Sequence, residues 1–320
     1  MTENAVLFWK LAKATLLRAV LIAVVVVGSV SAQTGGIERS PVYLAVSGNV
    51  ALDQHIHDLL QQSFHKHWDL ISVSGEQAAL IEDAPVITIG PGAFSRVRQA
   101  NRKVPVLAML TTRDFLEGFA SRSPGQISGV YFDVPLLRQA LIGKTILPHA
   151  SRIALIATTA SAELYDSLID ELPQYGLEAQ LFIVKEDKQL IPTLVRALSY
   201  GDFLLAAPDN AIYNPRTIKH VLLTAYRRNR IVIGPSQAYV KAGSIAAGYA
   251  PFPVMTEMAA EYLQEFFETG TFPEPDYPPS FNIAINQQVA RSLNIPLAPK
   301  EQIVKSVELQ IENKGVQIDE

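Results

Sequence analysis

The chain has 320 residues, a formal net charge of −4 at pH 7 and no cysteine. The absence of cysteine excludes a disulfide framework, a thiolate metal site, a thiol nucleophile and a lipid-modified cysteine. Positive and negative side chains are mixed along the sequence, so it contains no basic stripe of the kind that binds nucleic acid.

Residues 1–32 have the pattern of a secretory signal peptide. A basic segment that ends at Arg18 precedes an apolar run at 19–27, and small residues follow at 30–32. This pattern predicts export and cleavage after Ala32, with an uncleaved membrane anchor as the alternative. About 288 residues would then remain, a length that favours two lobes over a single core.

Nearly continuous apolar runs of strand length alternate with amphipathic segments of helical period in the rest of the chain. The predicted strands lie at 41–47, 69–73, 85–90, 104–110, 127–132, 152–158, 178–184, 203–207 and 231–233. The predicted helices include 51–65, 164–172, 190–198 and 255–267. Apolar strands of this kind require a sheet that is covered on both faces. The alternation predicts an α/β fold: two Rossmann-like three-layer lobes with parallel sheets and right-handed crossovers.

The loops that follow the predicted strands are rich in small hydroxyl and amide side chains. Open parallel sheets bind ligands beyond the carboxyl ends of their strands, where helix N-termini offer free N–H groups. Each residue taken alone is better explained as a helix cap. Taken together, the residues predict a cleft between two lobes that binds a small ligand. The candidate contacts are Ser47, Asn49, Gly90 and Thr112 in the first lobe, and Thr158, Thr159, Asp209, Tyr213 and Ser236 in the second.

Two motifs that could indicate catalysis or a cofactor are incomplete. The sequence Gly90-Pro91-Gly92 lacks the continuation of a dinucleotide fingerprint, and no Walker lysine occurs, so no nucleotide cofactor is expected. Ser236 lies in a sequence like a nucleophile elbow, but the last histidine, His220, precedes it. The usual order of a hydrolase triad therefore cannot be completed.

Four histidines lie close together, at positions 55, 57, 65 and 67. On one helix they would point in widely separated directions, so they could not all bind one ion. This favours a solvated helix end and no metal site, although His65 and His67 could pair if the helix ends early.

Three degenerate motifs follow one another between residues 40 and 300. They are Pro124–Val130 with the segments 136–146 and Pro148–Leu155, the stretch Tyr239–Tyr249, and Ile283–Asn286 with Leu293–Pro296. Together they resemble the substrate-binding proteins of ABC transporters of the tryptophan/tyrosine-binding type. The chain departs from that family at Thr112–Phe115 and at Thr158-Thr159, so an aromatic amino acid is not carried over as its ligand.

The resemblance implies a type I periplasmic-binding-protein fold with a first lobe at 38–132 plus 246–272 and a second lobe at 133–245 plus 273–300. Residues 301–320 form a charged C-terminal tail, for which the sequence leaves both a short strand and a mobile segment open. We therefore expect a periplasmic solute-binding protein without a cofactor. It would take a small polar or amphipathic ligand, such as an amino acid or derivative, and present it to an ABC permease in the inner membrane. One alternative is a ligand-binding accessory of a membrane sensor kinase or cyclase. Another, weaker one is a periplasmic enzyme with Asp114 or Asp209 as its base.

Overall fold

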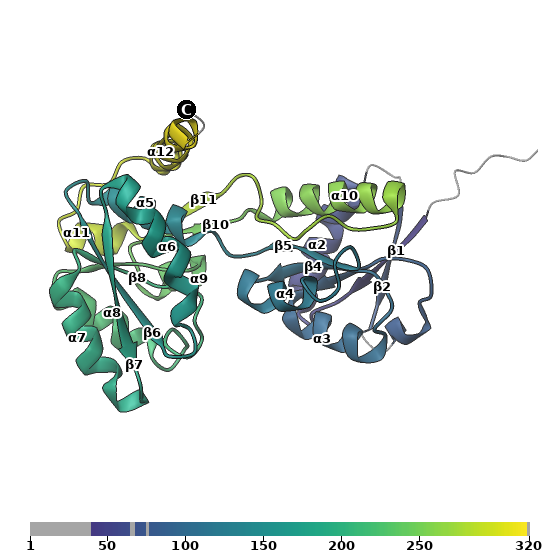
Figure 1. Ribbon diagram of the computed structural model, residues 1–320, viewed down its shortest axis with the longest axis horizontal. Helices are drawn as coiled ribbons and strands as arrows, with labels where there is room; N and C mark the ends of the chain where they lie inside the picture. The colour runs from purple at the N-terminus through teal and green to yellow at the C-terminus, as the bar shows by residue number, and fades with distance from the viewer. Residues whose placement is uncertain (1–39, 65–67, 75–76, 319–320) are drawn as a thin grey trace, which may run out of the picture. The chain divides into compact units, whose positions relative to one another are not determined.

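The computed structural model describes residues 40–64, 68–74 and 77–318 (Figure 1). All of them belong to one compact unit that begins at Ser40. The predicted signal peptide at 1–32, and the histidines at 65 and 67, lie outside the described residues. Within the described ranges, no helix is both long enough and apolar enough to cross a membrane.

The first sheet has five parallel strands in the order β2-β1-β3-β4-β5. They are β1 (Ser40–Ala45), β2 (Trp68–Val73), β3 (Val86–Ile89), β4 (Val106–Thr111) and β5 (Ile127–Tyr131). One face is covered by η1 (Gln77–Leu80), α3 (Gly90–Ala100) and α4 (Arg113–Ala120), and the other by α2 (Val50–Ser63) and α10 (Phe252–Thr269). All four residues of β3 are buried, as a strand in the middle layer must be.

The second sheet has six strands in the order β11-β10-β9-β8-β6-β7. They are β6 (Arg152–Thr158), β7 (Glu178–Val184), β8 (Phe203–Leu205), β9 (Ile231–Ile233), β10 (Ala246–Tyr249) and β11 (Asn282–Ile285). One face is covered by α5 (Leu136–Ile146), η2 (Ala162–Tyr165), α6 (Asp166–Glu171), η3 (Leu172–Tyr175), α11 (Gln287–Ser292) and α12 (Lys300–Ile318). The other face is covered by α7 (Leu190–Tyr200) and α8 (Ile218–Tyr226). Two short helices complete this part of the chain: η4 (Asp187–Gln189) precedes α7, and α9 (Gln237–Ala242) follows β9.

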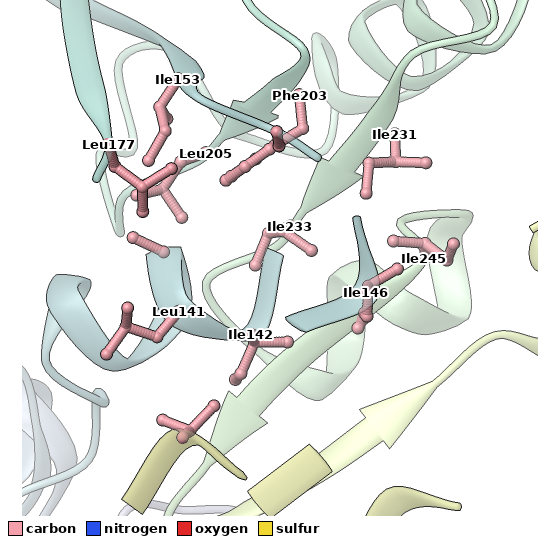
Figure 2. Close-up of a cluster of buried hydrophobic side chains, with 14 of the residues drawn as sticks. Leu141, Ile142, Ile146, Ile153, Leu177, Phe203, Leu205, Ile231, Ile233 and Ile245 are labelled. Atoms are coloured by element: carbon pink, nitrogen blue, oxygen red, sulfur yellow. The ribbon is translucent and has the colours of Figure 1, made fainter. Parts of the chain in front are cut away.

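Helix α5 lies directly on the second sheet. Its residues Leu141, Ile142 and Ile146 face the apolar side chains of the strands (Figure 2). Gly143 permits this close approach, because a Cβ atom there would lie 2.5 Å from Cε2 of Phe203. The absence of a side chain at residue 143 therefore lets α5 pack closely on β8.

The structure confirms the predicted fold class, two three-layer α/β lobes whose sheets are mostly parallel. It differs at the end of the chain, where β11 pairs with β10 in the antiparallel direction. It also breaks the predicted helix at 164–172 into η2, α6 and η3. Pro173 lies in the first turn of η3, and Gly176, which has φ +65°, ends η3.

The chain crosses between the sheets after β5, after β10 and again before β11. We expected residues 246–272 in the first lobe, but β10 pairs with β9 and β11 of the second sheet. From that range, α10, which contacts α2, packs on the first sheet together with Ala250 and Phe272. Residues 301–318 of the tail, whose structure the sequence left open, form most of α12. The other lobe boundaries stay predictions.

Candidate functional site

One carboxylate holds the loop between β1 and α2. Oδ1 of Asp53 accepts hydrogen bonds from the Ser47 backbone N–H (2.9 Å) and Ser47 Oγ (2.7 Å), and its Oδ2 accepts from Gly48 N–H (2.9 Å). Asn49 caps α2, and its Oδ1 accepts from Leu52 N–H at 3.3 Å. The predicted contacts Ser47 and Asn49 therefore use their polar groups within their own loop. Sequence reasoning missed Asp53, although an acidic residue in a first helical turn is a recognisable signal.

The other two predicted contacts of the first sheet begin helices. Gly90 is the first residue of α3 and has φ +79°, a conformation that glycine adopts without strain. Thr112 is the N-cap of α4, and its Oγ1 accepts from Phe115 N–H at 3.4 Å. Both residues shape the turn between a strand and a helix.

In the second sheet, Asp209 joins two loops that are far apart in the sequence. Its Oδ1 accepts from Ala211 N–H at 2.7 Å, and its Oδ2 accepts a hydrogen bond from Ser161 Oγ. Ser161 Oγ lies 2.9 Å from Thr158 Oγ1 and accepts from Thr158 N–H at 3.0 Å. The Asp209 side chain is buried, while Thr159 is exposed. Asp209 and Thr158 thus fix the loops after β8 and β6.

A cluster of tyrosines lies in and beside the core beneath these loops. The Tyr165 hydroxyl donates to Ile156 O and accepts from Ala207 N–H, both at 3.3 Å. The Tyr239 hydroxyl donates to Tyr213 O. Tyr213 is 1% exposed, and its hydroxyl makes no hydrogen bond of ordinary geometry to another described residue. Burial raises the pKa of both Tyr165 and Tyr213. The predicted contact Tyr213 therefore packs as a core residue.

Ser236, the last predicted contact, precedes α9 and is partly buried. Its side chain makes no capping hydrogen bond. Across the described ranges, no hydrogen bond joins it to a histidine. The geometry gives Ser236 no partner that would activate it as a nucleophile.

A cavity of about 570 Å³ lies beside the ends of both sheets. None of the nine predicted contacts lines it, but three of them are followed or preceded directly by lining residues: Arg113, Ala160 and Pro208. Much of the wall comes from the first turns of α4 and α5 and from α6. The lining residues are Arg113, Asp114, Glu117, Asp133, Pro135, Leu136, Leu137, Arg138, Ala160, Glu163, Leu164, Ser167, Leu168, Glu171, Pro208, Tyr277 and Ile311.

The two cations of the cavity wall differ in their surroundings. The Arg113 guanidinium forms an ion pair with Glu117 on the next turn of α4, with nitrogen–oxygen distances of 3.0 and 3.2 Å. The Arg138 guanidinium lies over the Phe281 ring, 5.4 Å from its centroid. No hydrogen bond or ion pair joins it to another residue in the described part of the chain, and burial lowers its pKa. Arg138 thus has N–H donors available to a ligand.

Carboxylates outnumber cations around the same cavity. Asp114, Asp133, Glu163 and Glu171 line it in addition to Glu117. Oδ1 of Asp133 accepts from Arg113 N–H at 3.1 Å, and burial raises the pKa of its carboxyl group. Within the described ranges, no group of three or more histidine, aspartate and glutamate residues is arranged to hold a metal ion.

A second cavity of about 560 Å³ shares Arg113, Glu117 and Tyr277 with the first. It also contains Tyr131, whose ring centroid lies 4.9 Å from that of Tyr277, and burial raises the pKa of Tyr131 to about 12. The segment before β11 is fixed to β5 here, because Tyr131 N–H donates to Asp276 O at 3.0 Å. Residues 272–279 of this segment contain four prolines, and none of them lies in a helix.

No protein-family model matches the sequence, and no curated protein sequence matches it. Several solved structures match the fold. A conserved domain protein from Vibrio cholerae has a TM-score of 0.57 at 16% identity, over 84% of this chain and 98% of that chain. An ABC domain in complex with L-Trp from Streptococcus pneumonia has a TM-score of 0.56 at 16% identity, over 84% and 97%.

A ligand-free, open substrate-binding protein with adhesive properties from Clostridium difficile has a TM-score of 0.63 at 14% identity, over 82% of this chain and 97% of that chain. At such identities the likeness concerns the fold. The element order, the two mostly parallel sheets and these similarities together show that the chain has a type I periplasmic-binding-protein fold.

Proposed function

We propose that the protein is a periplasmic solute-binding protein of an ABC importer. It would hold a small polar or amphipathic ligand, such as an amino acid or derivative, in the cavity of about 570 Å³. That volume falls within the range of small-molecule sites, roughly 300–1,000 Å³. The observation that carries the proposal is Arg138, a half-buried cation with unused donors in a wall rich in carboxylates.

The charges of the wall suit a ligand with both an anionic and a cationic group. Arg138 would bind a ligand carboxylate, because a guanidinium matches a carboxylate with two parallel hydrogen bonds. Asp114, Glu163 and Glu171 would attract an ammonium group. The nine strand-end residues stay predicted contacts, and Thr112, Thr159 and Asp209 adjoin the wall.

Two of the similar structures support a binding role. The Streptococcus domain is in complex with L-Trp, and the Clostridium protein is a substrate-binding protein. A permease in the inner membrane would then be the partner, and residues 1–32 would direct the protein to the periplasm. The ligands of these similar proteins do not identify the ligand of this chain, because the residues that line its own cavity determine which ligand it binds.

The test is a thermal-shift screen of the protein against amino acids, nucleosides and small organic acids. A ligand that binds only the folded state stabilises it by about 2.7 kcal/mol at a concentration of about 100 times Kd. We expect one class of zwitterionic compounds to raise the midpoint temperature of thermal unfolding. These compounds should be recovered chemically unchanged. A flat response from folded protein would contradict the proposal, and conversion of the compound would favour an enzyme.

The role of Arg138 is tested by Arg138→Met, with Arg122→Met as the matched control. Arg122 also lies over an aromatic ring, 5.3 Å from the Phe119 centroid, but it lines neither cavity described above. We expect Arg138→Met to weaken binding of the stabilising compound at least about tenfold, since a charge-assisted hydrogen bond contributes about 1.5–3 kcal/mol. Arg122→Met should leave Kd unchanged. Equal effects in the two variants would exclude Arg138 as a ligand contact.

A further inference from the structure

The C-terminal helix α12 is fixed to the second lobe along one face. Ile303 and Val307 are buried in the core between α12 and the second sheet. Gln310 Nε2 donates to Thr145 Oγ1 of α5 at 3.2 Å. Figure 1 shows α12 beside α5. The buried positions recur every four residues, so residue 311 continues the same face one turn further.

One residue on this face, Ile311, reaches the cavity. Ile311 lines it together with Leu137 of α5 and Leu168 of α6, and these side chains make one part of the wall apolar. Burial lowers the pKa of Arg138, and the negative charge of Glu308, which does not line the cavity, partly opposes this shift. By contrast, Leu309 points away from this face and is 45% exposed.

We propose that α12 forms part of the wall of the ligand cavity and that Ile311 limits the size of the apolar part of the ligand. This inference rests on the proposed function. It assigns a role to a helix that begins where the sequence resemblance ends, near residue 300. The specificity of the site would therefore depend on residues that the resemblance does not cover.

The position of Ile311 can be tested without a ligand, because the chain contains no cysteine. Ser167 of α6 is exposed and lines the cavity. In a variant with both Ile311→Cys and Ser167→Cys, a short bismaleimide should cross-link the two thiols within one molecule. The matched control combines Leu309→Cys with Ser167→Cys and should not cross-link. Absence of the cross-link in the first variant, or equal cross-linking in both, would overturn the inference.

The effect on specificity is tested with compounds of one class and increasing side-chain size, taken from those that stabilise the wild-type protein. Ile311→Ala should improve binding of the largest compounds relative to the smallest by about tenfold or more, and Ile311→Phe should do the reverse. Leu309→Ala and Leu309→Phe should leave the order unchanged. If the Ile311 variants keep the wild-type order, the inference is wrong even if the proposed function is right. If no compound stabilises the wild-type protein, the proposed function fails, and cross-linking decides whether α12 forms a cavity wall.

Discussion

The strand-end loops and the cavity wall adjoin each other in the sequence, but they use their polar groups differently. In the loops, the carboxylates of Asp53 and Asp209 each accept hydrogen bonds from a serine hydroxyl and from backbone N–H groups. In the wall, Arg113 pairs with Glu117, but Arg138 makes no hydrogen bond to another described residue. The difference teaches that polar residues in turns build the turns, while groups left without partners are available to a ligand.

The two loop carboxylates also differ in how far along the sequence their hydrogen-bond partners lie. Asp53 binds residues five and six positions before it, within one loop. Asp209 binds Ser161, 48 positions before it in another loop. Changes in the loops should therefore alter stability, most of all at Asp209, and changes in the wall should alter binding.

Asp209→Ala should have the largest effect on stability. It leaves the buried Ile212 N–H and the part-buried Ala211 N–H and Ser161 Oγ without their partner, which should cost about 3 kcal/mol of unfolding free energy. Urea denaturation measures the loss. Asp209→Asn, which keeps one acceptor oxygen, should lose less. If Asp209→Ala abolished ligand binding while unfolding stayed unchanged, Asp209 would belong to the binding wall and the comparison would fail.

Asp53→Ala should have a smaller effect of the same kind, about 2 kcal/mol, because its bonds are local and its loop is more exposed. Asp58→Ala, an exposed change on the same helix, serves as the control and should stay within about 0.5 kcal/mol of wild type. The same denaturation experiment compares them. A larger loss for Asp53 than for Asp209 would reverse the order that the geometry predicts.

The buried tyrosines give a matched pair with opposite expectations. Tyr165→Phe removes a hydroxyl that bonds Ile156 O and Ala207 N–H, so it should destabilise by about 1–2 kcal/mol. Tyr213→Phe removes a buried hydroxyl that makes no hydrogen bond of ordinary geometry, so it should be neutral or slightly stabilising. Thermal unfolding of the two variants distinguishes them. Equal losses would mean that the two hydroxyls act as one network.

Asp133 should make stability depend weakly on pH. Burial raises the pKa of its carboxyl group in the folded state, so the folded state favours the protonated form. The contribution of the Asp133 carboxyl group to the free energy of unfolding is fully present below the pKa of the unfolded state, about 3.9. It is lost as pH rises through the higher pKa of the folded state. Asp133→Asn keeps an acceptor for Arg113 N–H and removes the dependence. Its stability relative to wild type should rise from pH 3 to neutral pH and then stay level; a relative stability that falls over this range would contradict the assignment.

Sequence reasoning located the strands that are buried on both faces. The bounds of β6 and β9 were predicted to the residue, because apolar runs end there at polar or glycine residues. The bounds of the partly exposed edge strand β7 were also predicted to the residue. It missed β10 and β11 as strands, since Ala246-Ala247-Gly248 has little strand propensity and is fixed by pairing with its neighbours. Pairing with neighbouring strands, which the local sequence pattern does not show, therefore determines that β10 and β11 are strands.

The candidate site was less accessible to the same reasoning. Loops at strand ends could be found because turn residues are distinctive. The wall of the cavity instead uses residues within helices, such as Arg138 in the first turn of α5 and Ile311 in α12, where a ligand-facing residue has no local signature. Only the packing of α5, α6 and α12 reveals which of their side chains share a cavity.

The most direct test of the central claim is calorimetric titration of the best stabilising compound into Ser167→Trp and Ser199→Trp. Both serines are exposed on helices, but Ser167 lines the cavity and Ser199 on α7 does not. The indole at 167 should fill the cavity and weaken binding at least about tenfold, a change of about 1.4 kcal/mol, while Ser199→Trp binds as wild type does. Equal and undiminished binding by both variants would show that the ligand site lies elsewhere.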